Sequence, residues 1–260
     1  MARLSLPALL LGALIGCRAF APTTGHDFPT PERAEETVPG PIAPVSAQSP
    51  QTNPRPAAEV RREAEPIALA LDCLERGDNA AAVRYLKVHV TRHADQVLFR
   101  AQLAELLLGL NRFSEAQAEF EGVIACSQEG APGTRSRLVH YHTRLMEIAR
   151  EREDEYGEYL HRGIGLHLVA CQLAGKGASG AGDVERLQCK AAAALKEAQA
   201  LRPEDARASW YLYRVWSQLD QPRPADKALH KAVATAPFSK LTPLEARELA
   251  LVSRTGRYPK

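Results

Sequence analysis

The strongest constraint on the fold of this chain is an internal similarity at an offset of 34 residues. Positions that match across this offset are small in both copies or apolar in both copies: Leu69-Ala70 with Leu103-Ala104, Cys73 with Leu107, Ala82 with Ala116, and Leu86 with Phe120. Repeats of this length are typical of helix pairs that stack side by side and bury their apolar faces against one another. The sequence therefore predicts two helix pairs, 59–76 with 79–93 and 96–110 with 113–127.

The composition agrees with a helical protein. Hydrophobic residues make up 45% of the 260 residues, whereas aromatic residues make up only 6%, which is low for an all-β domain or for a surface that stacks nucleic-acid bases. The formal net charge of +2 gives no broad basic field, so we expect no nucleic-acid partner.

A further unit lies near the C-terminal end. Large and small residues stand there at positions that correspond to those of the first units, namely Leu212, Trp216, Ala225 and Leu229, and they are followed by Ala232 and Pro237. The second-helix half of another unit precedes it, marked by Ala191, Leu195, Ala198 and Pro203. Pro237 is expected to end the second helix, because proline cannot continue one.

This pattern resembles the tetratricopeptide repeat (TPR), over residues 63–128 and 187–237. The resemblance implies an all-α, TPR-like solenoid of helical hairpins, whose first helices line a concave face that binds other proteins. The tail from Leu241, opened by Thr242-Pro243, is expected to form a helix that caps the last repeat. The alternative is an alanine-rich helical bundle without a repeat architecture.

The middle of the chain departs from the 34-residue rule. Residues 155–174 could be the first helix of the unit that Ala191 marks if the glycine-rich stretch Gly175 to Gly182 is a loop insertion of about a dozen residues. Residues 134–152 would then form an extra helix, or would run on into the next one despite Gly157, Gly163 and Gly165.

The first residues resemble the signal peptide of a bacterial lipoprotein. An apolar run of roughly a dozen residues is too short to span a bilayer but suits an export signal, and it ends in Leu14-Ile15-Gly16-Cys17. The resemblance implies that Cys17 carries the lipid, including palmitate, and becomes the N-terminus of an exported protein, at the outer membrane rather than the inner because Arg18 follows it. The alternative is an ordinary secretory signal with a chance cysteine.

Four cysteines remain in the exported chain, namely Cys73, Cys126, Cys171 and Cys189. Cys171 and Cys189 flank the glycine-rich stretch, so a disulfide between them is geometrically possible in an oxidising compartment. The alternative, which we favour, is that all four are small buried residues without a bond.

The first helix of the last predicted repeat carries a candidate partner-binding stripe. Arg207, Trp210 and Arg214 are spaced i, i+3 and i+7, at positions that the TPR resemblance places on the concave face. Two guanidinium groups beside an indole would suit an extended peptide with a carboxylate. The equivalent positions of the first repeats are Ile67, Leu71, Ala101 and Glu105, so the clamp of carboxylate-binding TPR proteins is incomplete. Trp210 could instead pack against a neighbouring helix.

The histidines raise a second hypothesis, an exported helical enzyme or metal-binding protein. His89 and His93 are four residues apart, and four more histidines fall in the middle region: His140, His142, His161 and His167. No supporting ligand motif accompanies them, so we interpret them as surface histidines and expect no metal, no cofactor and no enzymatic activity. Gly175 to Gly182 also lacks the Lys-Ser or Lys-Thr pair of a phosphate-binding loop.

The sequence thus predicts a lipid-anchored scaffold of the bacterial cell envelope that binds a protein or peptide, with no small-molecule substrate. Its predicted parts are a signal peptide (1–16), a disordered Pro-rich linker (17–56), two repeats (57–128), an irregular helical middle (129–186), further repeats (187–240), and a capping helix with a tail (241–260).

Overall fold

The computed structural model describes residues 57–127, 134–176 and 180–255, and within these ranges every regular element is helical. The all-α prediction is therefore confirmed for this part of the chain. The predicted signal peptide, Cys17 and the linker lie outside the described residues. Among the helices that the structure describes, none is both long and apolar enough to cross a membrane.

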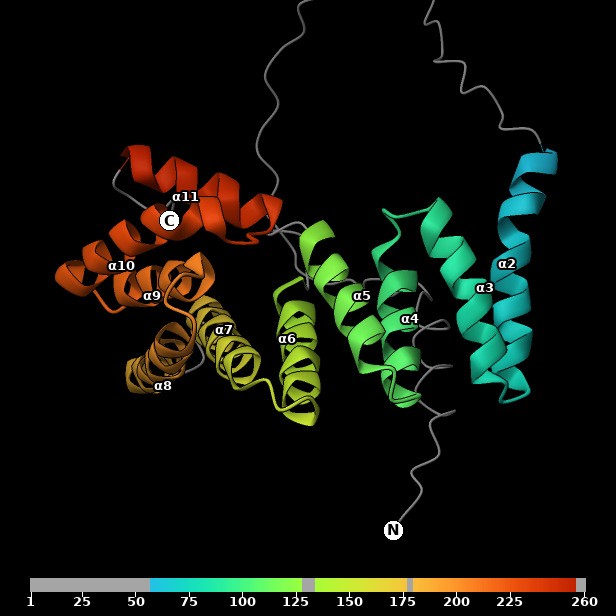
Figure 1. Cartoon of the computed structure of the whole chain (residues 1–260), viewed down its shortest axis with the longest axis horizontal. Helices are drawn as coiled ribbons and strands as arrows, with labels where there is room; N and C mark the ends of the chain where they lie inside the picture. The colour runs from blue at the N-terminus through green and yellow to red at the C-terminus, as the bar shows by residue number, and fades with distance from the viewer. Residues whose placement is uncertain (1–56, 128–133, 177–179, 256–260) are drawn as a thin grey trace, which may run out of the picture. The chain divides into compact units, whose positions relative to one another are not determined.

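The N-terminal part consists of two helical hairpins. Its helices are α2 (Ala57–Glu75), α3 (Asn79–Arg92), α4 (Val97–Gly109) and α5 (Phe113–Cys126). Each packs against its neighbours in chain order, as Figure 1 shows. Their bounds fall within two residues of those predicted from the 34-residue offset. The prediction is accurate because the residues that match across this offset are also the ones that the helices bury.

The hairpin corners repeat as the helices do. Gly77 and Asn111, 34 positions apart, both have positive φ angles, of 76° and 57°. This left-handed conformation lets the backbone N–H of the next residue donate to a carbonyl oxygen of the preceding helix. Asp78 N donates to the Cys73 carbonyl across 2.8 Å, and Arg112 N donates to the Leu107 carbonyl across 2.9 Å. Glu153 and Asp220 make the same corner between later helices.

Small residues lie where helices cross closely. Ala82 and Ala116, which the offset aligns, are both fully buried, and Ala225 is 4% exposed. Large side chains fill the space around them, led by Phe120 at 0% exposure. Alanine is needed here because a longer side chain would hold the helix axes apart.

The middle of the chain is a row of three helices, α6 (Thr134–Glu151), α7 (Glu155–Lys176) and α8 (Ala181–Leu201), with α7 packed against both others. Residues 134–151 are therefore a separate helix. The extra length of this unit is present, but it does not form the predicted glycine-rich loop of about a dozen residues: α7 extends through Gly175, and α8 begins just before Gly182. Helix ends tolerate glycine, so the glycines did not mark the extent of the loop.

Glycine inside α7 serves close packing instead. A Cβ atom at Gly163 would lie 2.6 Å from Leu195 Cγ and 3.2 Å from the Ala191 carbonyl oxygen of α8. Residue 163 therefore has to be glycine for α7 to approach α8 this closely.

The C-terminal part contains the hairpin of α9 (Ala206–Gln218) and α10 (Pro222–Thr235), then a short 3-10 turn (Ala236–Phe238) and α11 (Pro243–Thr255). Thr242 and Glu245 begin α11 with a reciprocal cap: Thr242 N donates to Glu245 Oε2 across 2.7 Å, and Glu245 N donates to Thr242 Oγ1 across 3.2 Å. Leu249 and Val252 bury the helix against the repeat, so α11 acts as the predicted cap.

Candidate interaction surface

The predicted binding stripe on α9 is covered. Trp210 is 0% exposed, and the side chains of Arg207 and Arg214 are 14% and 10% exposed. The prediction that these three residues line an open groove is therefore wrong in this structure, and the alternative that Trp210 packs inside the protein describes it. The physical reason is that α9 packs against α8 and α10, while two glutamates of α11 pair with the arginines of the stripe.

Ion pairs join the two helices. Arg207 Nε lies 3.5 Å from Glu245 Oε1, and Arg214 Nη1 lies 3.7 Å from Glu248 Oε2. Burial disfavours the charged form of Arg207, but Glu245 and the neighbouring Tyr211 more than offset this effect, so the pKa of Arg207 is raised above its ordinary value. The cations predicted to bind a partner's carboxylate instead contact carboxylates of the same chain.

Aromatic rings complete this covered region. Trp210 stacks on Tyr213 with ring centroids 5.5 Å apart, and the guanidinium of Arg214 lies 5.3 Å from the centroid of Tyr211. The indole is therefore part of the core of the last repeat.

The equivalent repeat positions on α4 are exposed or partly exposed to solvent. The shift that aligns Ala116 with Ala225 also aligns the α4 stripe of Leu98, Ala101 and Glu105 with the α9 stripe of Arg207, Trp210 and Arg214. Leu98 is 60% exposed, and Leu71 on α2, the counterpart of Glu105, is 40% exposed. We refer to Leu71, Leu98 and Glu105 as the open face.

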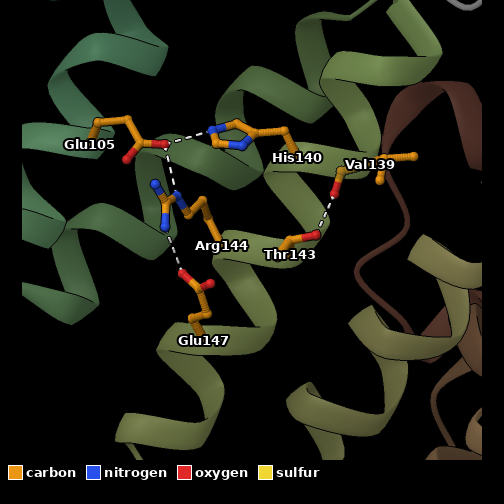
Figure 2. Close-up of polar contacts among 6 residues, drawn as sticks. All are labelled: Glu105, Val139, His140, Thr143, Arg144 and Glu147. Atoms are coloured by element: carbon orange, nitrogen blue, oxygen red, sulfur yellow. Dashed lines mark hydrogen bonds and ion pairs between the residues drawn. The ribbon is translucent and has the colours of Figure 1, made fainter. Parts of the chain in front are cut away.

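A polar cluster lies beside the open face, between α4 and α6 (Figure 2). Glu105 Oε1 contacts His140 Nε2 across 2.7 Å and accepts from Arg144 Nε across 3.1 Å, and Arg144 Nη1 donates to Glu147 Oε2 across 2.9 Å. Partial burial disfavours the charged form of Arg144, but Glu147 and Glu105 outweigh it and raise the pKa of Arg144. Two carboxylates thus meet one guanidinium and one imidazole on a surface that stays partly exposed.

The interpretation of the histidines as surface residues is wrong for four of them. His89, His142, His161 and His167 are at most 5% exposed. His142 lies four residues after the buried Leu138, on the core side of α6, and this phase is the signal that could have revealed it. His140, which contacts Glu105, does lie on the surface.

His142 and His161 form a buried pair between α6 and α7. Their Nδ1 atoms are 3.1 Å apart, so one imidazole donates its Nδ1 proton to the other. Burial, and then the nearby Arg207, lower the pKa of His142 to about 3. Burial, then His142 and Arg207, lower the pKa of His161 well below its ordinary value. Both rings are therefore neutral at neutral pH.

The described histidines do not form a metal site. Among the described residues, no group of three or more His, Cys, Asp or Glu side chains is placed to hold a metal ion. His89 instead shares a hydrogen bond of 2.7 Å with Gln96.

The cysteines follow neither prediction. All four described cysteines are free, so the structure has no Cys171–Cys189 bond. Cys189 is exposed, whereas the adjacent Gln188 faces α7, because successive positions on a helix point in different directions. The prediction that all four are buried fails too: Cys73 is buried, Cys171 is partly exposed, and Cys126 is exposed.

A search of protein-family models finds no match for this sequence, and a search of curated proteins finds none. Solved structures with a similar arrangement include YrrB, described as a TPR protein with an unusual peptide-binding site, at 13% identity and a TM-score of 0.33 over 76% of this chain and 96% of its own. MamA from Desulfovibrio magneticus RS-1 is 16% identical, with a TM-score of 0.30 over 68% and 96% of the two chains. PilW, described as a widely conserved type IV pilus biogenesis factor, is 16% identical, with a TM-score of 0.31 over 77% and 96%. At such identities and scores the likenesses carry no argument about function, and the TPR-like architecture of this chain rests on its own helix pairs, corners and core positions.

Proposed function

We propose that this protein is a lipid-anchored scaffold of the bacterial cell envelope, and that it binds an amphipathic helix of a partner protein on the open face. The observation that carries the proposal is a difference between equivalent positions. On α9 they are buried and their arginines pair with glutamates of the chain itself, and on α4 they hold an exposed leucine and, two turns further along the helix, a partly exposed carboxylate.

The packing of α11 on the last repeat supplies a template for the bound partner. It uses apolar residues such as Leu249 to cover the repeat, and glutamates to pair with the cations of the stripe. A partner helix with the same distribution of apolar and charged residues would fit the open face if it carried cations where α11 carries glutamates.

Charge complementarity sets the chemistry of that partner. Glu105 of α4 stands where α9 has Arg214, and Glu147 adds a second carboxylate to the cluster. The partner helix would therefore carry leucine-like residues against Leu71 and Leu98, and a lysine or arginine beside Glu105.

The proposed anchor rests on the sequence. Leu14-Ile15-Gly16-Cys17 would place two or more acyl chains on the new N-terminus, enough for stable attachment to a membrane. Residues 17–56 would then separate the anchor from the repeats.

Position-specific photo-crosslinking in a bacterial host tests the open face. A photoreactive amino acid at Leu98 should yield a discrete adduct with one partner, whereas the same group at Val88, which is 43% exposed on the second helix α3, should not. Adding Glu105→Lys to the Leu98 probe should weaken the adduct at least tenfold, because it places a cation against the partner's cation. The proposed function fails if positions 98 and 88 give the same adducts, or if Glu105→Lys changes nothing.

Lipidation is tested separately by metabolic labelling with a palmitate analogue and membrane fractionation. The native chain should carry the label and sediment with membranes, and Cys17→Ser should abolish both. Cys126→Ser, which changes an exposed cysteine of the folded part, is the matched control and should retain both. An unlabelled native chain would remove the anchor from the proposal without affecting the crosslinking result.

A further inference from the structure

A closed ring of four polar side chains joins α7, α8 and α9. It consists of His167 and Cys171 on α7, Gln188 on α8 and Gln218 on α9, none of which belongs to the open face. His167 and Gln188 are fully buried or nearly so, whereas Cys171 is partly exposed and Gln218 is exposed. The ring thus begins inside the protein and ends at its surface.

Three of the hydrogen bonds follow one direction around the ring. His167 Nδ1 donates to Gln188 Oε1 across 3.0 Å, and Gln188 Nε2 donates to Gln218 Oε1. Gln218 Nε2 then donates to Cys171 Sγ across 3.1 Å, and the Cys171 thiol donates back to Gln218 Oε1 across 3.4 Å. Cys171 Sγ closes the ring at His167 Nε2, 3.7 Å away.

This direction fixes the tautomer of His167. With its proton on Nδ1 and donated to Gln188, the imidazole presents the lone pair of Nε2 to the thiol of Cys171. Tyr211 contacts the ring of His167 edge to face, with centroids 6.3 Å apart, and helps to hold its orientation. A thiol next to a base that a third group orients is the arrangement that activates nucleophilic cysteines.

The ring also supports the thiolate once it forms. When the proton moves from Cys171 Sγ to His167 Nε2, the sulfur anion faces two N–H donors, Gln218 Nε2 and the newly protonated Nε2. Gln188 Oε1 continues to accept from Nδ1 of the resulting imidazolium.

We propose that Cys171 is a nucleophilic thiol site that exchanges with low-molecular-weight disulfides, with His167 as its base and Gln188 and Gln218 as positioning residues. In this reaction His167 takes the thiol proton, and Cys171 Sγ attacks one sulfur of the disulfide. A new bond forms between Cys171 and that sulfur while the original sulfur–sulfur bond breaks. The leaving thiolate takes the proton back from His167, so the products are a mixed disulfide on Cys171 and one free thiol.

The chain supplies its own reference thiols. Cys126 and Cys189 are more exposed than Cys171, and access alone would make them faster. Cys126 Sγ contacts the carbonyl oxygen of Ala94 across 4.0 Å rather than a ring nitrogen. A faster Cys171 would therefore report activation, not exposure.

The experiment uses the full chain with Cys17→Ser, in three versions that each keep one surface cysteine, at position 171, 126 or 189, with Cys73 unchanged in all. Each version is reacted with dithiodipyridine and with oxidised glutathione across a pH series. We expect Cys171 to react at least tenfold faster than the other two at neutral pH, and to keep much of its rate below the pH at which their rates fall. The proposal is overturned if Cys171 reacts at the rate of Cys126 and Cys189 or more slowly.

Two variants separate activation from mere packing. His167→Gln should bring the rate of Cys171 down to that of the reference thiols and remove its distinct pH profile. Because His167 is buried and this change could unfold the protein, Gln218→Ala at the surface is the second variant. It should lower the rate severalfold while the thermal unfolding midpoint stays constant. An unchanged Cys171 rate in Gln218→Ala, or in folded His167→Gln, would overturn the assignment.

Discussion

The α4 and α9 helices occupy equivalent places in the repeat, yet one has an open face and the other is covered. On α4 the aligned positions hold Leu98, 60% exposed, and Glu105 within a partly exposed cluster. On α9 they hold Arg207 and Arg214, paired with glutamates of α11. The difference teaches that the repeat position sets where a side chain points, and the surrounding chain decides whether it meets solvent.

The comparison predicts its largest effect at Trp210. Trp210→Ala should cost about 3–5 kcal/mol of unfolding free energy, because it removes a fully buried indole that stacks on Tyr213. Leu98→Ala, on the equivalent stripe of α4, should change it by less than about 0.5 kcal/mol. Urea unfolding followed by circular dichroism measures both. Similar costs for the two variants would contradict the distinction between the faces.

A second pair of variants compares the ion pairs. Glu245→Gln keeps an oxygen for the cap of α11 but leaves the buried Arg207 without its carboxylate, and should cost about 3 kcal/mol. Glu105→Gln acts on a partly exposed pair and should cost about 1 kcal/mol or less. The same urea experiment applies, and adding salt should reduce only the smaller effect. Equal costs would mean that α11 does not shield Arg207.

The last comparison concerns an acid-dependent loss of stability from the buried histidine pair, which builds up only as the pH falls. The pKa of His142 is about 3 in the folded protein and near 6.5 when unfolded, so below pH 6.5 the unfolded chain binds the proton first. Stability should therefore fall as pH drops from 6.5 toward 3, by up to about 1.4 kcal/mol per pH unit for this group. His142→Asn should flatten this slope relative to the native chain, and His140→Asn, on the surface, should leave it unchanged. Denaturant midpoints at several pH values measure the slopes, and identical slopes in all three proteins would exclude the buried pair as the cause.

The helix pairs could be predicted from the sequence because local and repeated signals agree there. The small positions Ala82 and Ala116 are both buried, and the corners at Gly77 and Asn111 fall at the same offset. Each of these features depends on residues close in the chain or one repeat away.

The burial of the predicted binding stripe could not be predicted from such local or repeated signals. Whether Arg207 and Arg214 meet solvent depends on α11, a segment whose first residue comes 29 positions after Arg214. Two cations flanking a tryptophan look the same in sequence whether the carboxylates come from a partner or from the tail. The four-residue ring around Cys171 draws on three helices, so no single spacing motif marks it. His142 is different, since its phase relative to Leu138 and Leu145 already indicated burial.

The four left-handed corners offer a route to a sturdier protein. Only Gly77 carries the residue type that this conformation favours, while Asn111, Glu153 and Asp220 hold it with a side chain attached. Glutamate is the least suited of the three, because asparagine and aspartate are the usual exceptions. Replacing Glu153, at the bend after α6, with glycine is therefore the first change to make for a more heat-resistant protein. This residue belongs neither to the open face nor to the thiol ring, so both would be left unchanged.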